Sequence, residues 1–180
     1  MSADLPFHSL SDLASRLARG ETTSRALVEA CLARIDERDG KLHAFVDVYR
    51  DDALKLADAA DIERGAGATR GPLHGLPVAL KDLFEIEGRQ TTAGSKSWLG
   101  RTSDYTATAV AKLVGAGMIP LGKTHMVEFA FGGWGRNEPM GAPWNPWDMA
   151  THRVAGGSSS GSAVAVAAGL VPAAIGSDTG

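Results

Sequence analysis

The chain has 180 residues, of which 44% are hydrophobic and 22% are charged, and its formal net charge at pH 7 is -3. This composition is typical of a globular protein with a buried core and argues against a disordered chain. The basic residues are scattered and form no stripe with aromatic residues, so nothing in the charge pattern indicates a nucleic-acid partner.

The N-terminal residues predict neither export nor a membrane anchor. They lack the basic and apolar regions of a secretory signal. The longest apolar stretch, residues 163–175, is interrupted by Gly169 and Pro172 and is shorter than a membrane span requires. We therefore expect a cytoplasmic protein without a membrane segment.

The first 70 residues read mainly as helices, at 9–18, 24–37 and 51–64, with a short and mostly apolar run at 44–48. Thr22 or Thr23 can cap the second helix. The single cysteine, Cys31, lies on the apolar stripe of that helix, which predicts a core position and leaves no partner for an intramolecular disulfide. We expect residues 1–70 to form a helical layer without catalytic residues.

From residue 71 onward, short apolar strands alternate with helices. Strands are predicted at 78–80 and 118–121, helices at 106–116 and 163–168, and a further strand toward residue 175. Such alternation predicts an α/β fold with a mainly parallel central sheet, whose loops at one edge carry the chemistry. Residues 71–180 would begin the catalytic core of a single domain. Residues 173–180 show no terminal helix or polar tail, so we expect the chain to stop inside that domain.

Residues 117–124 match the phosphate-binding pattern G-x-x-x-x-G-K-[ST] letter for letter. A phosphate loop presents backbone amides between a strand and a helix, whereas this segment is apolar, contains Pro120 and follows a predicted helix. We interpret it as a buried strand.

Two further patterns suggest other hydrolases. Residues 157–161 contain G-x-S-x-G, the nucleophile elbow of α/β-hydrolases, but no hydrophobic strand precedes it and no histidine follows it. Residues 178–180 spell the aspartic-protease triplet, but that chemistry needs two such carboxylates in one site. We reject the aspartic-protease interpretation; the nucleophile elbow is disfavoured, and it stays open because a histidine would lie beyond residue 180.

Lys81 at a predicted strand end, the serine and glycine cluster at 156–162 and the glycine-rich turn at 176–180 remain to be explained. Together with several ordered motifs they resemble the amidase signature family over essentially the whole chain. These motifs are Gly75-Leu76-Pro77-Val78-Ala79-Leu80-Lys81-Asp82, Thr91-Thr92-Ala93-Gly94-Ser95, Gly122-Lys123-Thr124, Asn145-Pro146-Trp147 and Gly156-Gly157-Ser158-Ser159.

The resemblance implies a three-layer fold and hydrolysis of a linear amide C–N bond through a serine acyl-enzyme. It implies a relay in which Lys81 is the base and Ser158, preceded by a cis peptide, is the bridge. The nucleophilic serine would lie two positions beyond Gly180, so the 180 residues alone would be inactive. The remaining carried-over residues are Thr179 and Gly180 in the oxyanion hole, Ala130 beside the acyl group, and Ser159 and Asp178 as supports.

The chemistry is separately plausible. A serine hydroxyl needs a base, and a lysine is a base only when neutral. Lowering a lysine pKa to near 7 takes about 4 to 5 kcal/mol, which burial without a close carboxylate can supply. Two ordinary alternatives stand beside these roles: Lys81 as a solvated lysine paired with Asp82, and Ser158 as a helix cap, for which Ser159, Ser160 and Ser162 compete. Ser160 also departs from the glycine usual in the family.

The remaining candidate residues carry weaker signals. His125 either lines the pocket or makes structural hydrogen bonds, and Trp134 is a core or loop anchor that could instead touch substrate. The histidines show no metal-ligand spacing, and the scheme needs no cofactor. A glutaminase subunit of a tRNA-dependent amidotransferase, with partner subunits, and a non-catalytic binding fragment are the two alternatives. We also expect a homodimer and a small-molecule amide substrate.

Overall fold

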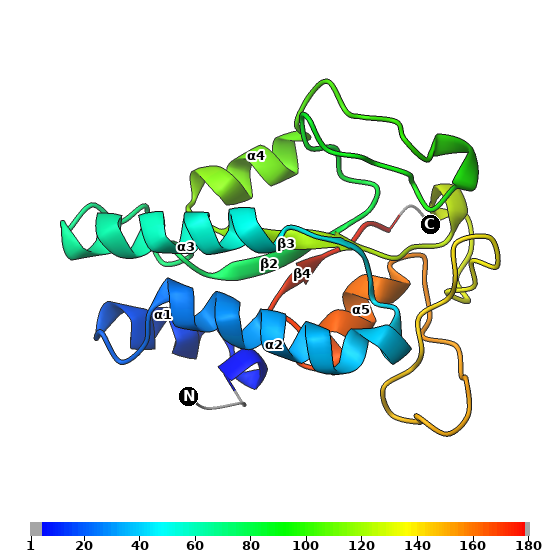
Figure 1. Ribbon diagram of the computed structural model, residues 1–180, viewed down its shortest axis with the longest axis horizontal. Helices are drawn as coiled ribbons and strands as arrows, with labels where there is room; N and C mark the ends of the chain where they lie inside the picture. Colours follow the sequence, from blue (N-terminus) through cyan, green and yellow to red (C-terminus); the bar gives the residue numbers. More distant parts are fainter. Residues whose placement is uncertain (1–4, 179–180) are drawn as a thin grey trace.

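A four-stranded sheet lies between two groups of helices (Figure 1). The computed structural model describes residues 5–178. Helices α1, α2 and α5 lie on one side of the strands and α4 on the other, with α3 beside the sheet (Figure 1). The elements are η1 Leu5–Phe7, α1 Leu10–Ala18, α2 Ser24–Leu42, β1 Phe45–Val48, α3 Arg50–Gly65, β2 Pro77–Lys81, η2 Lys96–Trp98, α4 Thr108–Gly115, β3 Ile119–Thr124, η3 Glu128–Ala130, α5 Ser160–Ala167 and β4 Ala174–Ile175.

The strand order is β1-β3-β2-β4. Strand β2 pairs in parallel with both β3 and β4, and β1 pairs antiparallel with β3 at the edge. The predicted α/β fold with a mainly parallel sheet is therefore confirmed. The first 70 residues contribute the edge strand β1 as well as helices.

Strand β3 is longer than the sequence predicts, because it continues through Gly122, Lys123 and Thr124. A Cβ atom at Gly122 would lie 2.1 Å from the carbonyl oxygen of Asp47, so only glycine lets β1 approach this closely. The phosphate-loop pattern is thus part of a buried strand, as the apolar letters indicate.

Helix α2 begins where the sequence predicts but runs five residues past the predicted end at residue 37. The Thr23 hydroxyl caps its start by accepting from the amide of Ala26 at 3.0 Å. Its end lies at His43, which adopts the left-handed conformation with φ 51°. The Asp39 carboxylate accepts from the amide of Ala44 at 2.7 Å. The helix therefore ends where these local contacts cap it, and not at residue 37, where the apolar periodicity stops.

Cys31 belongs to the core between α2, α3, α5 and the sheet. Its side chain is buried, and this burial raises the thiol pKa to about 12. The predicted core position of this cysteine is confirmed. No helix described in residues 5–178 has both the length and the apolar composition for crossing a membrane.

Candidate functional site

Lys81 is the last residue of β2 and is completely buried. Its amine lies at the carboxyl end of a parallel strand, the edge at which α/β proteins place their sites. Lys81 Nζ donates to Ser158 Oγ at 2.6 Å and to Ser177 Oγ at 2.8 Å. The structure therefore brings together Lys81 and Ser158, which are 77 positions apart in the sequence.

Ser158 stands immediately before α5, and the Gly157–Ser158 peptide bond is cis, the arrangement that the resemblance implies for the bridging serine. The N-cap position of α5 is occupied by Ser159, whose side chain makes no capping hydrogen bond. The Ser158 hydroxyl lies against Lys81 instead. The helix-cap alternative therefore does not describe the position that Ser158 takes.

Ser159 lies beside the turn that follows β4. Its hydroxyl donates to the carbonyl oxygen of Ser177 and accepts from the Ser177 amide, both at 3.2 Å. A Cβ atom at Gly176 would lie 2.6 Å from Ser159 Oγ, so the glycine lets the turn approach. Sequence reasoning missed Ser177 as a partner of Lys81, and only its place next to Asp178 in the glycine-rich turn could have suggested it.

Burial lowers the pKa of Lys81, while the nearby negative charge of Asp178 acts in the opposite direction. The amine is surrounded by hydroxyl groups that can exchange protons with it. The arrangement thus places hydroxyl groups around an amine whose charged form is disfavoured by burial. The predicted oxyanion residues Thr179 and Gly180 lie outside the described residues.

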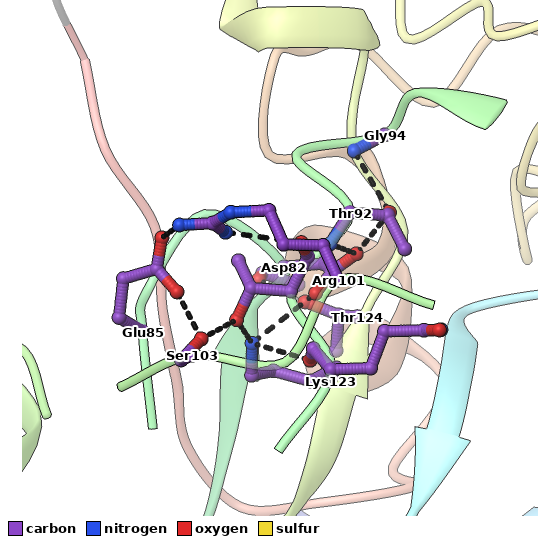
Figure 2. A network of polar contacts seen from close by, with 11 residues as sticks. Asp82, Glu85, Thr92, Gly94, Arg101, Ser103, Lys123 and Thr124 are labelled. Atoms are coloured by element: carbon purple, nitrogen blue, oxygen red, sulfur yellow. Dashed lines mark hydrogen bonds and ion pairs between the residues drawn. The ribbon is translucent and has the colours of Figure 1, made fainter. Parts of the chain in front are cut away.

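Asp82 is not the partner of Lys81. Its carboxylate accepts from Lys123 Nζ at 3.1 Å, and both side chains are buried (Figure 2). The ordinary alternative for Lys81, an exposed lysine paired with Asp82, is therefore wrong: Lys81 is buried, and Asp82, which directly follows β2, continues the alternation of the strand and binds Lys123. Nothing in the sequence around Lys123 indicates this buried pair.

Ala130 lies in η3 after β3. Phe129 and Ala130 both adopt left-handed conformations, with φ 50° and 59°. The Ala130 amide donates to the carbonyl oxygen of Val127 at 2.9 Å, and the Val127 amide donates to that of Ser158 at 3.0 Å. Ala130 thus lies two main-chain hydrogen bonds from the relay serine, whereas the nearby Trp134 is 73% exposed.

His125 is buried, and this burial lowers the pKa of its imidazole to about 4. Its main-chain amide donates to Ala44 and its carbonyl oxygen accepts from Gly161, at 2.8 and 2.9 Å. Its Nδ1 has no partner among the described residues. Within residues 5–178 no group of three or more His, Cys, Asp or Glu side chains could hold a metal ion.

The chain is similar to amidases and to subunits of amidotransferases. Residues 26–180 match the family model described as Amidase. The chain is 49% identical to a glutamyl-tRNA(Gln) amidotransferase subunit of Chromohalobacter salexigens, over 95% of its own length and 35% of that protein. It is 51% identical to the protein of the same name from Burkholderia vietnamiensis, over 96% of this chain and 34% of the relative.

Among solved structures, the native peptide amidase from Stenotrophomonas maltophilia superposes with a TM-score of 0.82 at 38% identity. The match covers 91% of this chain and 34% of the peptide amidase. The chain spans about a third of the length of the curated relatives that it matches.

Proposed function

The chain belongs to the amidase signature family, and from this premise we propose that it contributes to an enzyme that hydrolyses a carboxylic amide to an acid and an amine or ammonia. The observation that carries the proposal is the buried 2.6 Å contact between Lys81 Nζ and Ser158 Oγ. A lysine held among hydroxyl groups, with a pKa lowered by burial, has the properties of a general base.

In the proposed scheme, neutral Lys81 takes the proton of Ser158, and Ser158 takes the proton of the nucleophilic serine that the family places two positions after Gly180. That serine attacks the amide carbonyl carbon and forms a tetrahedral intermediate, whose oxyanion is stabilised by amides of the turn at Thr179 and Gly180. The relay then runs in reverse and protonates the departing amine.

Water completes the cycle by attacking the acyl-enzyme, with the relay again accepting a proton. Ser159 supports the scheme because it fixes the turn at Ser177, and Asp178 is proposed to brace the same turn. Ala130 is proposed to lie beside the acyl group. The scheme uses no metal or cofactor, and a cytoplasmic location and a homodimer stay predictions.

A second candidate function is supported by the names of the relatives. Two proteins about half identical to this chain are named as subunits of glutamyl-tRNA(Gln) amidotransferase. Under that alternative the same relay would release ammonia from glutamine for use by another chain of the assembly. Purification from the source cell discriminates between the two: stable partner subunits favour the amidotransferase, and a protein that hydrolyses amides without partners favours the amidase.

Replacement of Lys81 by Ala in the intact enzyme tests the relay. We expect kcat for amide hydrolysis to fall by about 10³-fold or more, because the serine would lose its base. In the unchanged enzyme, kcat/KM should rise with pH as Lys81 loses its proton, with a midpoint below the ordinary lysine value because burial lowers this pKa. Near-normal hydrolysis by a folded K81A enzyme would overturn the proposal.

A further inference from the structure

Lys81 and Asp82 are adjacent in sequence but serve opposite faces of the sheet. Lys81 faces α5 and meets Ser158 there. Asp82 faces the segment of residues 91–94, which lies against the other face, and the residue is 1% exposed. A buried carboxylate is stable only when its oxygens have donors, so the donors of Asp82 show what this residue holds.

The donors come from two segments (Figure 2). One oxygen of Asp82 accepts from Lys123 Nζ at 3.1 Å. The other accepts from the Thr92 amide at 3.1 Å and from the Thr92 hydroxyl. Lys123 Nζ also donates to Thr91 Oγ1 at 2.9 Å, and the network continues through Ser103, Glu85 and Arg101. The carboxylate thus joins β2, β3 and the turn at residues 91–94.

The main chain continues this connection back to the relay. The Ala93 amide donates to the Asp82 carbonyl oxygen at 3.0 Å, and the Phe129 amide donates to the Ala93 carbonyl oxygen at 2.8 Å. At the start of the same short segment, the Val127 amide donates to the Ser158 carbonyl oxygen at 3.0 Å. This series of hydrogen bonds therefore begins at Asp82, which follows the strand of Lys81, and ends at Ser158, the hydrogen-bond partner of Lys81.

The backbone along this path is held in an unfavourable conformation. Ala93, Phe129 and Ala130 have φ values of 50°, 50° and 59°, in the left-handed region that costs a residue with a Cβ atom about 1 to 2 kcal/mol. Such residues persist where surrounding contacts over-determine them. At Ala93 such a contact is the hydrogen bond from its amide to the main-chain carbonyl oxygen of Asp82, and the Asp82 carboxylate binds the preceding residue, Thr92.

We infer that Asp82, clamped by Lys123 and Thr92, is a positioning residue that holds Ser158 at its contact distance from Lys81. The inference rests on the proposed function in one respect, that the Lys81–Ser158 contact carries the proton. Proton transfer needs hydrogen-bond reach, and a misplacement of about 1 Å can cost about 10²-fold in rate. The hydrogen bonds from Asp82 through Ala93, Phe129 and Val127 to Ser158 join the two ends of this contact.

Thr92→Val in the intact enzyme tests the inference, because it keeps the volume of the side chain and removes the hydroxyl that donates to Asp82 and accepts from the Gly94 amide at 3.1 Å. We expect kcat to fall by about 10- to 100-fold with KM nearly unchanged, since the contact acts in chemistry and not in binding. Hydrogen exchange at the Phe129 amide should become faster. Thr92→Ser retains the hydroxyl and should restore both properties.

Thr106→Val is the matched control, because the Thr106 hydroxyl accepts one hydrogen bond, from the Glu87 amide, at an exposed position. It should leave kcat and the exchange of Phe129 unchanged. Should the Thr92→Val protein not fold, Thr91→Val removes the acceptor of Lys123 one step further away, and a smaller decrease in kcat with faster Phe129 exchange is expected.

Two results would overturn the inference: a folded Thr92→Val or Thr91→Val enzyme with the kcat of the parent, or a slow enzyme in which the Phe129 amide exchanges as before. Lys81→Ala, measured in parallel, separates the two proposals. If it is inactive while Thr92→Val is fully active, the positioning inference fails alone, and if it is active, the proposed function fails.

Discussion

Two buried lysines on neighbouring strands have different surroundings. Lys81 ends β2 and Lys123 lies in β3, with exposures of 0% and 1%. Lys81 meets the hydroxyl groups of Ser158 and Ser177, whereas Lys123 meets the carboxylate of Asp82. The same side chain at the same depth therefore lies between two serine hydroxyl groups in one strand and beside a carboxylate in the next.

The difference teaches that burial alone does not make a catalytic lysine. Burial lowers the pKa of both residues, and the charge of a carboxylate opposes the shift in each case: that of Asp178 for Lys81, and that of Asp82 for Lys123, which also donates to Asp82 at 3.1 Å. The pKa of Asp82 shifts in the opposite direction, because burial raises it, while the positive charge of Lys123 acts to lower it. Asp82 is engaged on the other face of the sheet, and the hydrogen-bond partners of Lys81 include the hydroxyl groups of Ser158 and Ser177 and the carbonyl oxygen of Ser177.

Lys81→Met gives the largest expected contrast. We expect turnover to fall by about 10³-fold or more while the free energy of unfolding stays equal or increases, because the change removes a base and also a buried amine whose charged form is penalised. Amide hydrolysis and urea unfolding at pH 7 measure the two quantities. A loss of stability as large as that of the Lys123 variant below would remove the distinction between the lysines.

Lys123→Met should destabilise the protein by about 3 to 5 kcal/mol, because it leaves Asp82 buried without its cation. The double variant Asp82→Asn, Lys123→Met removes both charges and should recover part of this loss. Urea unfolding of the parent, of the two single variants Asp82→Asn and Lys123→Met, and of the double variant gives the coupling energy. Equal stability of the Lys123→Met variant and the parent would show that the pair contributes nothing.

His125 extends the comparison to a third buried base. Its folded pKa of about 4 lies below the unfolded value of 6.5, so the unfolded state binds more protons between these values and stability falls as pH decreases from 6.5 to 4. His125 accounts for about 3 kcal/mol of this loss at the acid limit. His125→Asn should flatten the pH dependence of unfolding by that amount, and an unchanged curve would contradict the assignment.

Ser159 and Ser160, at the start of α5, provide the smallest contrast. Ser159→Ala removes two hydrogen bonds to Ser177 and should cost about 1 to 2 kcal/mol of stability. The buried Ser160 hydroxyl has no partner among the described residues, so Ser160→Ala should be neutral or slightly stabilising. Thermal unfolding of the two variants compares them directly, and equal melting temperatures would contradict this reading of the turn.

Some elements could be predicted because their signals are local. Apolar spacing placed α2 and the Cys31 stripe, and the apolar letters of residues 117–124 indicated a strand in place of a phosphate loop. The prediction erred at boundaries, since β3 extends to Thr124 and α5 begins at Ser160, three residues before the predicted start. Both boundaries are set by contacts with distant segments, such as the hydrogen bond between Thr124 and Ser162 at 2.7 Å.

By itself the sequence determined the α/β alternation, the family and the identity of Lys81 and Ser158 as candidates, because periodicity and ordered motifs are properties of neighbouring letters. Only the tertiary structure decided that Lys123, and not Lys81, forms the ion pair with Asp82. Lys81 and Asp82 are adjacent letters, but the pleat of a strand sends them to opposite faces, and their partners come from positions 77 and 41 residues away. These distant partners determine the surroundings of the Lys81 amine and of the Asp82 carboxylate.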